Sequence, residues 1–263
     1  MTPILSVSGL EKTFDSVVAA HNISVDIPPG QTVGIIGANG AGKTTFVNMI
    51  TGHLVPSQGS IRFEGREITG LPSHTITRLG IARSFQVAQI FSSLTVIENM
   101  LMAAAVAREG KSLLHAAAAL LSAPATVREA EKALEHFRIS AFHNVRASTL
   151  PQGVRKLLDI AMAAAGEPRL LLLDEPTSGI SREEKHDLME VIISALKGRG
   201  TTVLFVEHDM EIVQRFADRV LAFSDGTIIA DGSPAQALAD PQVREFISGT
   251  FVSVRRRAEA GHA

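Results

Sequence analysis

Residues 37–44 read GANGAGKT, and this short stretch decides the fold of the chain. Its spacing is G-x-x-x-x-G-K-T, a pattern in which glycines let successive backbone N–H groups point inward at a phosphate. The run TVGIIG before it is typical of a strand, and the run TTFVNMI after it is typical of a helix. Because a helix N-terminus carries partial positive charge, the order strand, loop, helix predicts a phosphate-binding loop in an α/β core.

The residues of this loop predict a site for a nucleoside triphosphate and Mg²⁺. We expect Lys43 to hold the outer phosphates and Thr44 to give a hydroxyl to Mg²⁺, which prefers a few protein oxygens plus phosphate and water. The expected nucleotide-binding residues are Gly37, Ala38, Asn39, Gly40, Ala41, Gly42, Lys43, Thr44 and Thr45. A glycine-rich turn without a ligand is the alternative.

A second phosphate-directed element is LLLLDE, residues 170–175. A carboxylate at the end of a buried strand can order Mg²⁺ through its water, and the next carboxylate can position or deprotonate the attacking water. We expect Asp174 to take the first role and Glu175 the second. Taken alone, such a run is more often a strand that meets solvent; together with the loop it indicates nucleoside triphosphate hydrolysis.

The hydrophobic pattern changes along the chain. Short strand-like runs, ILSVSGL, NISVDI, QTVGIIG and GSIRFEG, fill the N-terminal part, and an alanine-rich, helical text follows from Ser73 to about Leu158. Within it, VREAEKALEHF places Val127, Ala130, Leu134 and Phe137 on one helix face. The later runs LLLLDE and TTVLFVEHD are separated by a helix with a capping-box start at Ser181, and strand, helix, strand predicts a parallel sheet.

Composition excludes several classes of protein. With 263 residues and 45% hydrophobic content the chain can bury a globular core, and its formal charge of -2 does not favour nucleic acid as a partner. The absence of cysteine rules out disulfides and thiolate metal sites. The start, MTPILSVSGL, does not resemble a signal peptide, and SLLHAAAALLSAPA is too short to span a bilayer and is interpreted as a packed helix. We therefore expect a cytosolic protein.

Three further motifs identify the family that the chain resembles. Phe85-Gln86 follows a strand-like run, DEPTSGI follows the acidic strand, and Glu207-His208-Asp209 follows the next helix and strand. Together with the loop they resemble the ATP-binding-cassette family, over about residues 5–249. The resemblance implies that Gln86 senses Mg²⁺ and contacts the transport partner, and that His208 contacts the γ-phosphate. Outside this context, Gln86 would more often be a solvated polar residue and His208 an ordinary histidine.

The resemblance also implies a fold and its boundaries. It predicts a P-loop NTPase core with a parallel sheet, an N-terminal antiparallel β portion and an inserted α-helical subdomain. We expect one ATPase domain over 1–250, in which 1–86 and 158–250 form the nucleotide-binding core and 87–157 the helical subdomain, followed by a basic tail at 251–263. Phe14 lies where the family stacks an aromatic ring on adenine; simple packing is the alternative for it.

The segment before the acidic strand departs from the family pattern. The family has LSGGQ there, which covers the ATP held by the other subunit of a dimer; this chain has Leu150, Pro151, Gln152, Gly153 and Val154. The serine hydroxyl is missing, whereas Gly153 keeps its N–H and proline suits the first turn of a helix that faces phosphate. Losing a hydrogen bond to a charged group, about 1.5–3 kcal/mol, would slow a reaction by one or two powers of ten.

Within the family, RSFQ, LTVIENM, VEHDM and DGSPAQALADPQV look most like the ATPase subunits of branched-chain amino acid importers, and urea and amide importers look similar. Asp15 stands where these subunits usually have glycine, and Ser181 where aspartate or asparagine is common. The resemblance implies an ATPase at the cytoplasmic face of the membrane that works with membrane-spanning permease subunits and, indirectly, a solute-binding protein.

The weakened segment 150–154 leads to a hypothesis about the dimer, because in a homodimer both ATP sites would lack the serine. We expect the partner to be a second, unlike cassette subunit. Two other classes stay open: a cassette ATPase acting on ribosomes or DNA, and a phosphate-loop protein with another task, such as a kinase.

Overall fold

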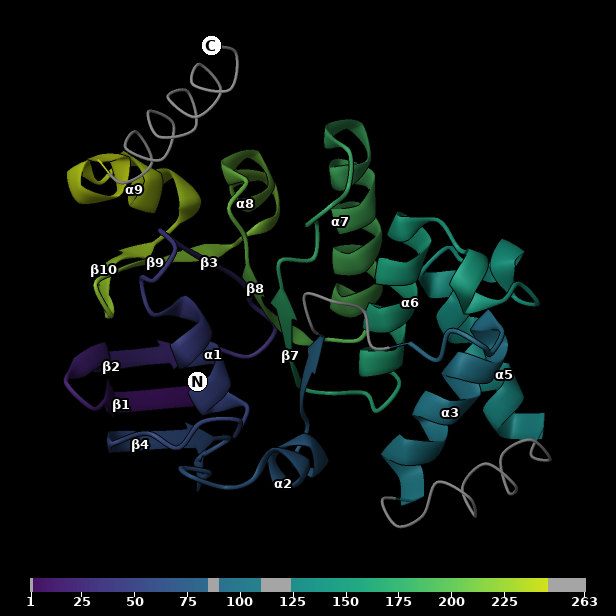
Figure 1. The fold of residues 1–263 in the computed structure, drawn as a ribbon, viewed down its shortest axis with the longest axis horizontal. Coiled ribbons are helices and arrows are strands. Elements are labelled where there is room, and N and C mark those ends of the chain that lie inside the picture. The colour runs from purple at the N-terminus through teal and green to yellow at the C-terminus, as the bar shows by residue number, and fades with distance from the viewer. Residues whose placement is uncertain (1, 85–89, 110–123, 246–263) are drawn as a thin grey trace. The chain divides into compact units, whose positions relative to one another are not determined.

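The structure is a computed structural model that describes residues 2–84, 90–109 and 124–245 (Figure 1). Its contacts group the chain into two units, Met1–Ser73 with Val206–Ala263 and His74–Phe205. Each unit combines strands with helices. The α/β class predicted from the sequence is therefore confirmed.

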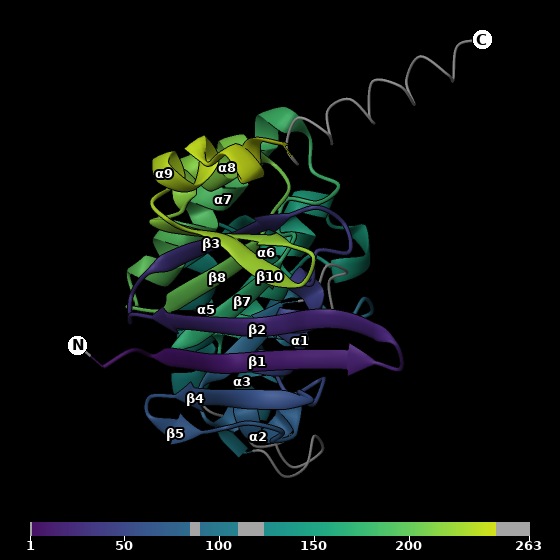
Figure 2. The same ribbon diagram turned by 90° about the vertical axis from the view of Figure 1, so that its left-hand side faces the viewer.

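The first unit contains an antiparallel sheet with the strand order β2-β1-β4-β5 (Figure 2). Its strands are β1 (Leu5–Phe14), β2 (Val17–Ile27), β4 (Gln58–Phe63) and β5 (Arg66–Glu67). Leu5 lies opposite Ile27 on one side and opposite Phe63 on the other, and all three are buried. Alternating apolar residues turn one face of this sheet to the core, which confirms the predicted N-terminal antiparallel portion.

Parallel pairing also occurs in the first unit. The elements are β3 (Thr32–Gly37), β9 (Arg219–Ser224), β10 (Thr227–Gly232), α1 (Lys43–Ile50), α8 (Met210–Phe216) and α9 (Pro234–Ala239). β3 pairs in parallel with β9, and every residue of β3 is buried, as expected for a strand covered on both faces. α1 returns onto β3, and the rings of Phe46 and Phe223 meet with centroids 5.2 Å apart. The packing of α1 on β3 orients the loop that joins them.

In its described residues, the second unit contains three strands, in the order β8-β7-β6. They are β6 (Ile81–Ser84), β7 (Leu170–Asp174) and β8 (Thr202–Val206), whose last residue groups with the first unit. β6 and β7 pair in parallel from Ile81 opposite Leu170 to Ser84 opposite Leu173. The four leucines of β7 are buried, and Asp174 follows them as the partly buried last residue of the strand.

Helices make up the rest of the second unit. They are α2 (Ser73–Arg78), α3 (Val96–Glu109), α5 (Pro124–His136), α6 (Gln152–Ala164) and α7 (Arg182–Lys197), with 3₁₀ turns at Ser140–Phe142 and Ala147–Thr149. α6 contacts β6 and β7 and also α3, α5 and α7 (Figure 1). Ala130, Leu134 and Phe137 are buried, whereas Val127 is half-buried. The predicted apolar face of α5 is therefore mostly confirmed.

The predicted start of α7 is also confirmed, because the side chain of Ser181 accepts a hydrogen bond from the Glu184 N–H. None of the helices in the described ranges is both long and apolar enough to cross a membrane. Most of the stretch SLLHAAAALLSAPA and the tail 251–263 lie outside the described residues. The subdomain boundaries at 87–157 stay a prediction.

Candidate functional site

Glycines shape the loop between β3 and α1. Gly37 closes β3 with a φ of 152°, and a Cβ there would lie 2.4 Å from the Phe223 carbonyl oxygen. Gly42 caps α1 with a φ of 96°, and a Cβ there would lie 2.7 Å from the Ala19 carbonyl oxygen. Both contacts are shorter than a side chain tolerates, so only glycine fits these two places. Gly40 also has a positive φ, 83°, but borders open space.

The loop offers a cation and backbone N–H groups to one ligand. The Lys43 Nζ donates to the Gly37 and Ala38 carbonyl oxygens, both at 2.8 Å, and the side chain is buried. The N-terminus of α1 has no side-chain cap and no acidic residue in its first turn. Its first N–H groups therefore keep their partial positive charge. Ala38, Asn39 and Gly40 are exposed, and these features fit a phosphate chain that arrives from solvent.

His208 belongs to the same unit as this loop. The Glu207 N–H donates to the Ile35 carbonyl oxygen at 3.2 Å, so His208 follows beside the strand that leads into the loop. The side chain of His208 is exposed. Asp209 then caps α8 by accepting from the Glu211 N–H at 3.1 Å. The strand end and the capped helix hold His208 between them, with its ring open to solvent.

Phe14 lies at the end of β1 and is 46% exposed, so its ring is not a core residue. The Lys12 Nζ lies 5.1 Å from the ring centroid and also donates to the Val55 carbonyl oxygen at 2.9 Å. The lysine is held over the ring by a cation–π contact. The next residue, Asp15, has a φ of 49°, which gives a physical reason for the glycine expected at this turn.

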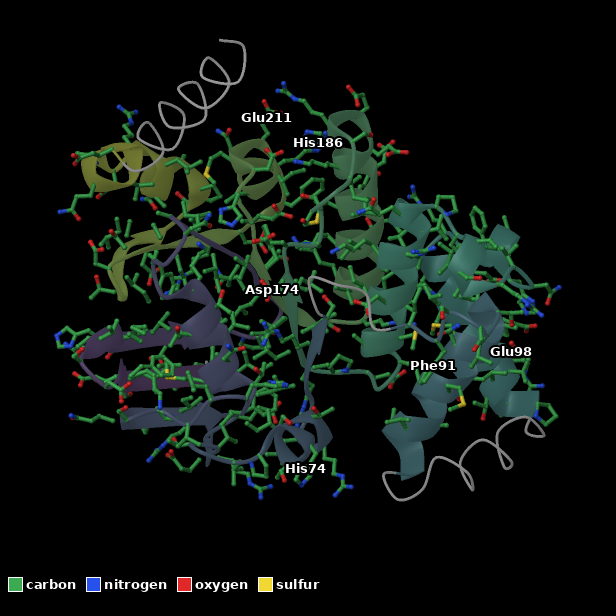
Figure 3. All side chains as sticks on the ribbon, viewed as in Figure 1. His74, Phe91, Glu98, Asp174, His186 and Glu211 are labelled. Carbon is green, nitrogen blue, oxygen red and sulfur yellow. The ribbon has the colours of Figure 1, made fainter. Side chains whose placement is uncertain are left out.

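The acidic pair lies in the second unit, at the end of β7 (Figure 3). Asp174 Oδ2 accepts from the Arg83 Nη2 at 2.6 Å, and the two side chains are only 16% and 8% exposed. Glu175 has a φ of 47°, a left-handed conformation that is unfavourable for a residue with a Cβ. Its carbonyl oxygen accepts from the Ser178 N–H at 3.0 Å and from the Lys156 Nζ at 3.4 Å. The backbone that carries the second carboxylate is therefore constrained.

The available ligand atoms fit Mg²⁺. In the first unit the exposed Thr44 offers a hydroxyl, and in the second unit Asp174 offers carboxylate oxygen; each is the kind of hard oxygen ligand that this ion prefers. Within residues 2–84, 90–109 and 124–245, no group of three or more histidine, cysteine or acidic side chains could hold a metal ion by itself.

The segment 150–154, which we call the signature segment, begins α6. Pro151 is the N-cap and Gln152 is the first helical residue, so the proline stands one residue earlier than its favoured first-turn position. The ψ of Pro151 is 153°, an extended value that cannot continue a helix. Pro151 makes no side-chain cap bond, and the Gly153 N–H lies in the first turn.

Two contacts hold the signature segment in place. The Arg155 side chain donates to the Ser148 carbonyl oxygen at 2.5 Å and to the Ala147 carbonyl oxygen at 3.3 Å, which fixes the turn before α6. The Gln152 amide packs on Gly179, and a Cβ added at Gly179 would lie only 2.2 Å from the Gln152 Nε2. Gly179 has a φ of 76° and belongs to the loop that follows Glu175. The start of α6 and this loop therefore touch directly.

The predicted site residues thus fall into two groups. The glycine-rich loop, Phe14 and His208 belong to the first unit, and Asp174, Glu175 and the signature segment belong to the second. Gln86 lies outside the described residues. Sequence reasoning missed Arg83 and Lys156, because their contacts depend on strand pairing and helix packing that no local motif encodes.

Comparisons with known proteins agree with these motifs. A family model described as "ABC transporter" matches residues 20–178. The chain is 37% identical to the high-affinity branched-chain amino acid transport ATP-binding protein BraF of Pseudomonas aeruginosa, over 92% of this chain and 96% of the relative. It is 36% identical, with the same coverage, to LivG of Escherichia coli K12, which carries the same description.

Among solved structures, the ADP conformation of MJ1267, described as an ATP-binding cassette of an ABC transporter, superimposes with a TM-score of 0.83 and 31% identity. The match covers 95% of this chain and 100% of that one. The fold is therefore that of a P-loop NTPase cassette, as the sequence predicted.

Proposed function

Because the chain belongs to the ABC transporter family, we propose that it is the ATP-hydrolysing subunit of an importer, with branched-chain amino acids as the solute. The observation that carries the ATPase assignment is the geometry of the loop between β3 and α1. The buried Lys43 ammonium and the uncapped N–H groups of α1 belong to this loop, and Gly37 and Gly42 in it leave no room for a side chain. The proposed solute is that named for BraF and LivG, to which the chain is similar over nearly its whole length.

In the proposed mechanism, ATP enters the loop and the Lys43 ammonium turns from the carbonyl oxygens of Gly37 and Ala38 to the outer phosphates. Thr44 and Asp174 would hold Mg²⁺, which when bound neutralises phosphate charge, and Gln86 would complete that shell. Phe14 would stack on adenine through the ring face opposite Lys12.

Glu175 would accept a proton from the water that attacks the γ-phosphorus, and His208 would donate a hydrogen bond to the oxygens that gain negative charge as the bond to ADP breaks. The left-handed backbone of Glu175 supports this assignment, because conformational strain in proteins concentrates at functional positions. The products are ADP and inorganic phosphate.

For the permease contact we propose the surface around Phe91, which lies beside α3 (Figure 3). Its ring is 43% exposed, yet its backbone is held by the fully buried Asn99, which accepts from the Phe91 N–H at 2.8 Å. The amide of Asn99 donates in return to the Phe91 carbonyl oxygen at 3.1 Å. A rigidly presented apolar ring suits docking to a cytoplasmic helix of a membrane-spanning subunit, because little entropy is lost on binding.

For the second cassette we propose a different, unlike subunit. This chain keeps its own phosphate loop, Glu175 and His208, but its signature segment brings no serine to the partner's ATP. Such a pair would contain one site covered by the partner's signature and one covered by the weakened segment. The assembly would lie peripherally on the cytoplasmic face of the membrane and receive solute from a binding protein.

Purification of the native complex from detergent-extracted membranes tests the proposal. We expect at least one multi-spanning subunit to co-purify, and ATP turnover to rise when leucine-loaded binding protein is added to the reconstituted complex. Urea and a short amide serve as the competing solutes, and a complex that carries Glu175→Gln gives the background. Stimulation by urea or amide alone would replace the solute, and recovery only with ribosomes or nucleic acid would overturn the transport assignment.

A matched variant tests the unlike pair. Pro151→Ser returns the missing hydroxyl, so it should accelerate the site on the partner more than the site on this chain. Site-specific turnover can be measured by removing one phosphate-loop lysine at a time, with Lys43→Ala in this chain and the matching lysine substitution in the partner subunit. A native homodimer with two equally fast sites that do not respond to Pro151→Ser would refute the unlike pair and leave the importer assignment intact.

A further inference from the structure

The ion pair between Arg83 and Asp174 ties an arginine to the carboxylate assigned to Mg²⁺. β6 and β7 run in parallel with Arg83 opposite Leu172, so the arginine side chain reaches along the strands to the end of β7. The distance between Arg83 Nη2 and Asp174 Oδ2 is 2.6 Å. The side chains of Arg83 and Asp174 are only 8% and 16% exposed, so the pair is largely removed from water. Charges in such a partly buried place attract each other more strongly than charges at the surface do.

This contact changes what an arriving metal ion meets. One oxygen of Asp174 is already occupied, and the charge of the carboxylate is balanced by a guanidinium that cannot lose its proton. A divalent cation must therefore either share the carboxylate with Arg83 through the second oxygen or displace the arginine. In the first case it binds beside a positive charge, and in the second it must break the ion pair, so the arginine opposes metal binding in both cases.

The same contact protects the fold when no metal is bound. A carboxylate that is mostly buried without a counter-charge is strongly destabilising. Arg83 supplies that charge from within the same unit, so the carboxylate of Asp174 has a counter-charge at the end of β7 without a metal ion.

We propose that Arg83 is the resident counter-cation of Asp174, so that recruitment of Mg²⁺ is a competition between two cations for one carboxylate. Arg83 is a positioning residue that sets the metal concentration at which the site loads. The inference rests on the proposed function, because it assumes that Asp174 serves the metal.

A purely structural ion pair and a competing ion pair predict opposite changes in metal affinity when Arg83 is replaced. If Arg83 only orients Asp174, its loss disorders a ligand, and metal affinity falls by about 10–100-fold, as for other partners that orient metal ligands. If Arg83 competes with the metal, its loss tightens metal binding.

The test uses the whole chain with ADP and Mn²⁺ as probes, and free Mn²⁺ is followed by electron paramagnetic resonance. We expect Arg83→Gln, which keeps hydrogen-bond donors but removes the charge, to bind Mn²⁺ about tenfold more tightly than the original chain does. Arg83→Lys keeps the charge and should stay within about threefold of the original affinity. Arg219→Gln is the control, because it breaks an equally short ion pair, to Asp231, in the other unit; its Mn²⁺ affinity should not change.

Unfolding, first in EDTA and then with Mn²⁺ and ADP, gives a second measurement that does not depend on the spectroscopic signal of free Mn²⁺. Arg83→Gln should be less stable than the original chain in EDTA and should recover more of that loss when Mn²⁺ and ADP are added. Unchanged or weaker Mn²⁺ binding by Arg83→Gln would overturn the inference.

Asp174→Asn separates this failure from failure of the proposed function. If Asp174→Asn loses Mn²⁺ affinity while Arg83→Gln does not gain it, the counter-cation idea alone is wrong. If Asp174→Asn leaves Mn²⁺ affinity unchanged, the metal role of Asp174 is wrong and the inference falls with it. Should Arg83→Gln not fold, Arg83→Met carries the same expectation.

Discussion

The backbone of Glu175 makes a prediction about stability that can be separated from catalysis. With a φ of 47°, its Cβ lies close to a carbonyl oxygen, which costs a residue with a side chain roughly 1–2 kcal/mol. Glycine does not have this steric cost, although it loses more conformational entropy on folding, which lowers the stability by about 0.5–1 kcal/mol. We therefore expect Glu175→Gly to be about 0.5–1 kcal/mol more stable than Glu175→Ala, the reverse of the usual order.

Two further alanine and glycine pairs complete the experiment, with stability measured by urea unfolding. At Glu190, an exposed position within α7, alanine should be the more stable by about 0.5–1 kcal/mol. At Glu167, which is exposed and has a φ of 49°, glycine should be the more stable, as at Glu175. ATP hydrolysis should be lost in both Glu175 variants and kept in both Glu167 variants. A Glu175→Ala protein more stable than Glu175→Gly would refute the strain at this carboxylate.

Three further outcomes are expected. Glu175→Gln should bind MgATP normally but hydrolyse it at least about 100-fold more slowly, because an amide cannot accept the proton from water. Lys43→Ala should instead weaken ATP binding itself, and equal affinities of the two variants for a fluorescent ATP analogue would count against the loop assignment. The Thr95 N–H donates to the Glu98 carboxylate at 2.7 Å and lowers the pKa of that carboxyl. The stability that Glu98 adds relative to Glu98→Ala, below about 1 kcal/mol, should therefore be present above the ordinary pKa of glutamate and disappear as pH falls through the lowered pKa. A difference in thermal unfolding between the two proteins that does not change with pH would contradict this. Phe91→Ser should reduce co-purification of the permease without changing ATP turnover of the isolated chain, and loss of that turnover would show that the surface serves the fold instead.

Local sequence signals were enough to predict much of this protein. The phosphate loop, the buried strand before Asp174 and the cap at Ser181 each lie within one short stretch, where periodicity and helix-start chemistry act directly. The N-terminal β portion followed in the same way from short strand-like runs, whereas its antiparallel pairing was implied by the resemblance. The resemblance added His208 and Phe14, whose surroundings the structure describes in the first unit.

Contacts over long sequence distances could not be predicted in the same way. Arg83 meets Asp174 across 91 positions because two parallel strands share a register, and Lys156 meets Glu175 because α6 packs on β7. The left-handed backbone of Glu175 also has no local signal, since glutamate rarely adopts it. In each case tertiary packing, not residue preference, decides the conformation.

The contact between Gln152 and Gly179 makes these two positions epistatic. A side chain at 179 would require the Gln152 amide to move, because its Nε2 would lie 2.2 Å from the new Cβ, and the φ of 76° at this position would strain the new residue as well. Glycine at 152 would leave an unfilled gap beside the loop. Placing the family glycine at 152 would therefore remove the amide that packs on Gly179, in the finished LSGGQ sequence as well as in any intermediate. A double-mutant cycle over the two positions should show strong coupling, so an engineer who edits the signature segment must treat the loop after Glu175 as part of the same unit of design.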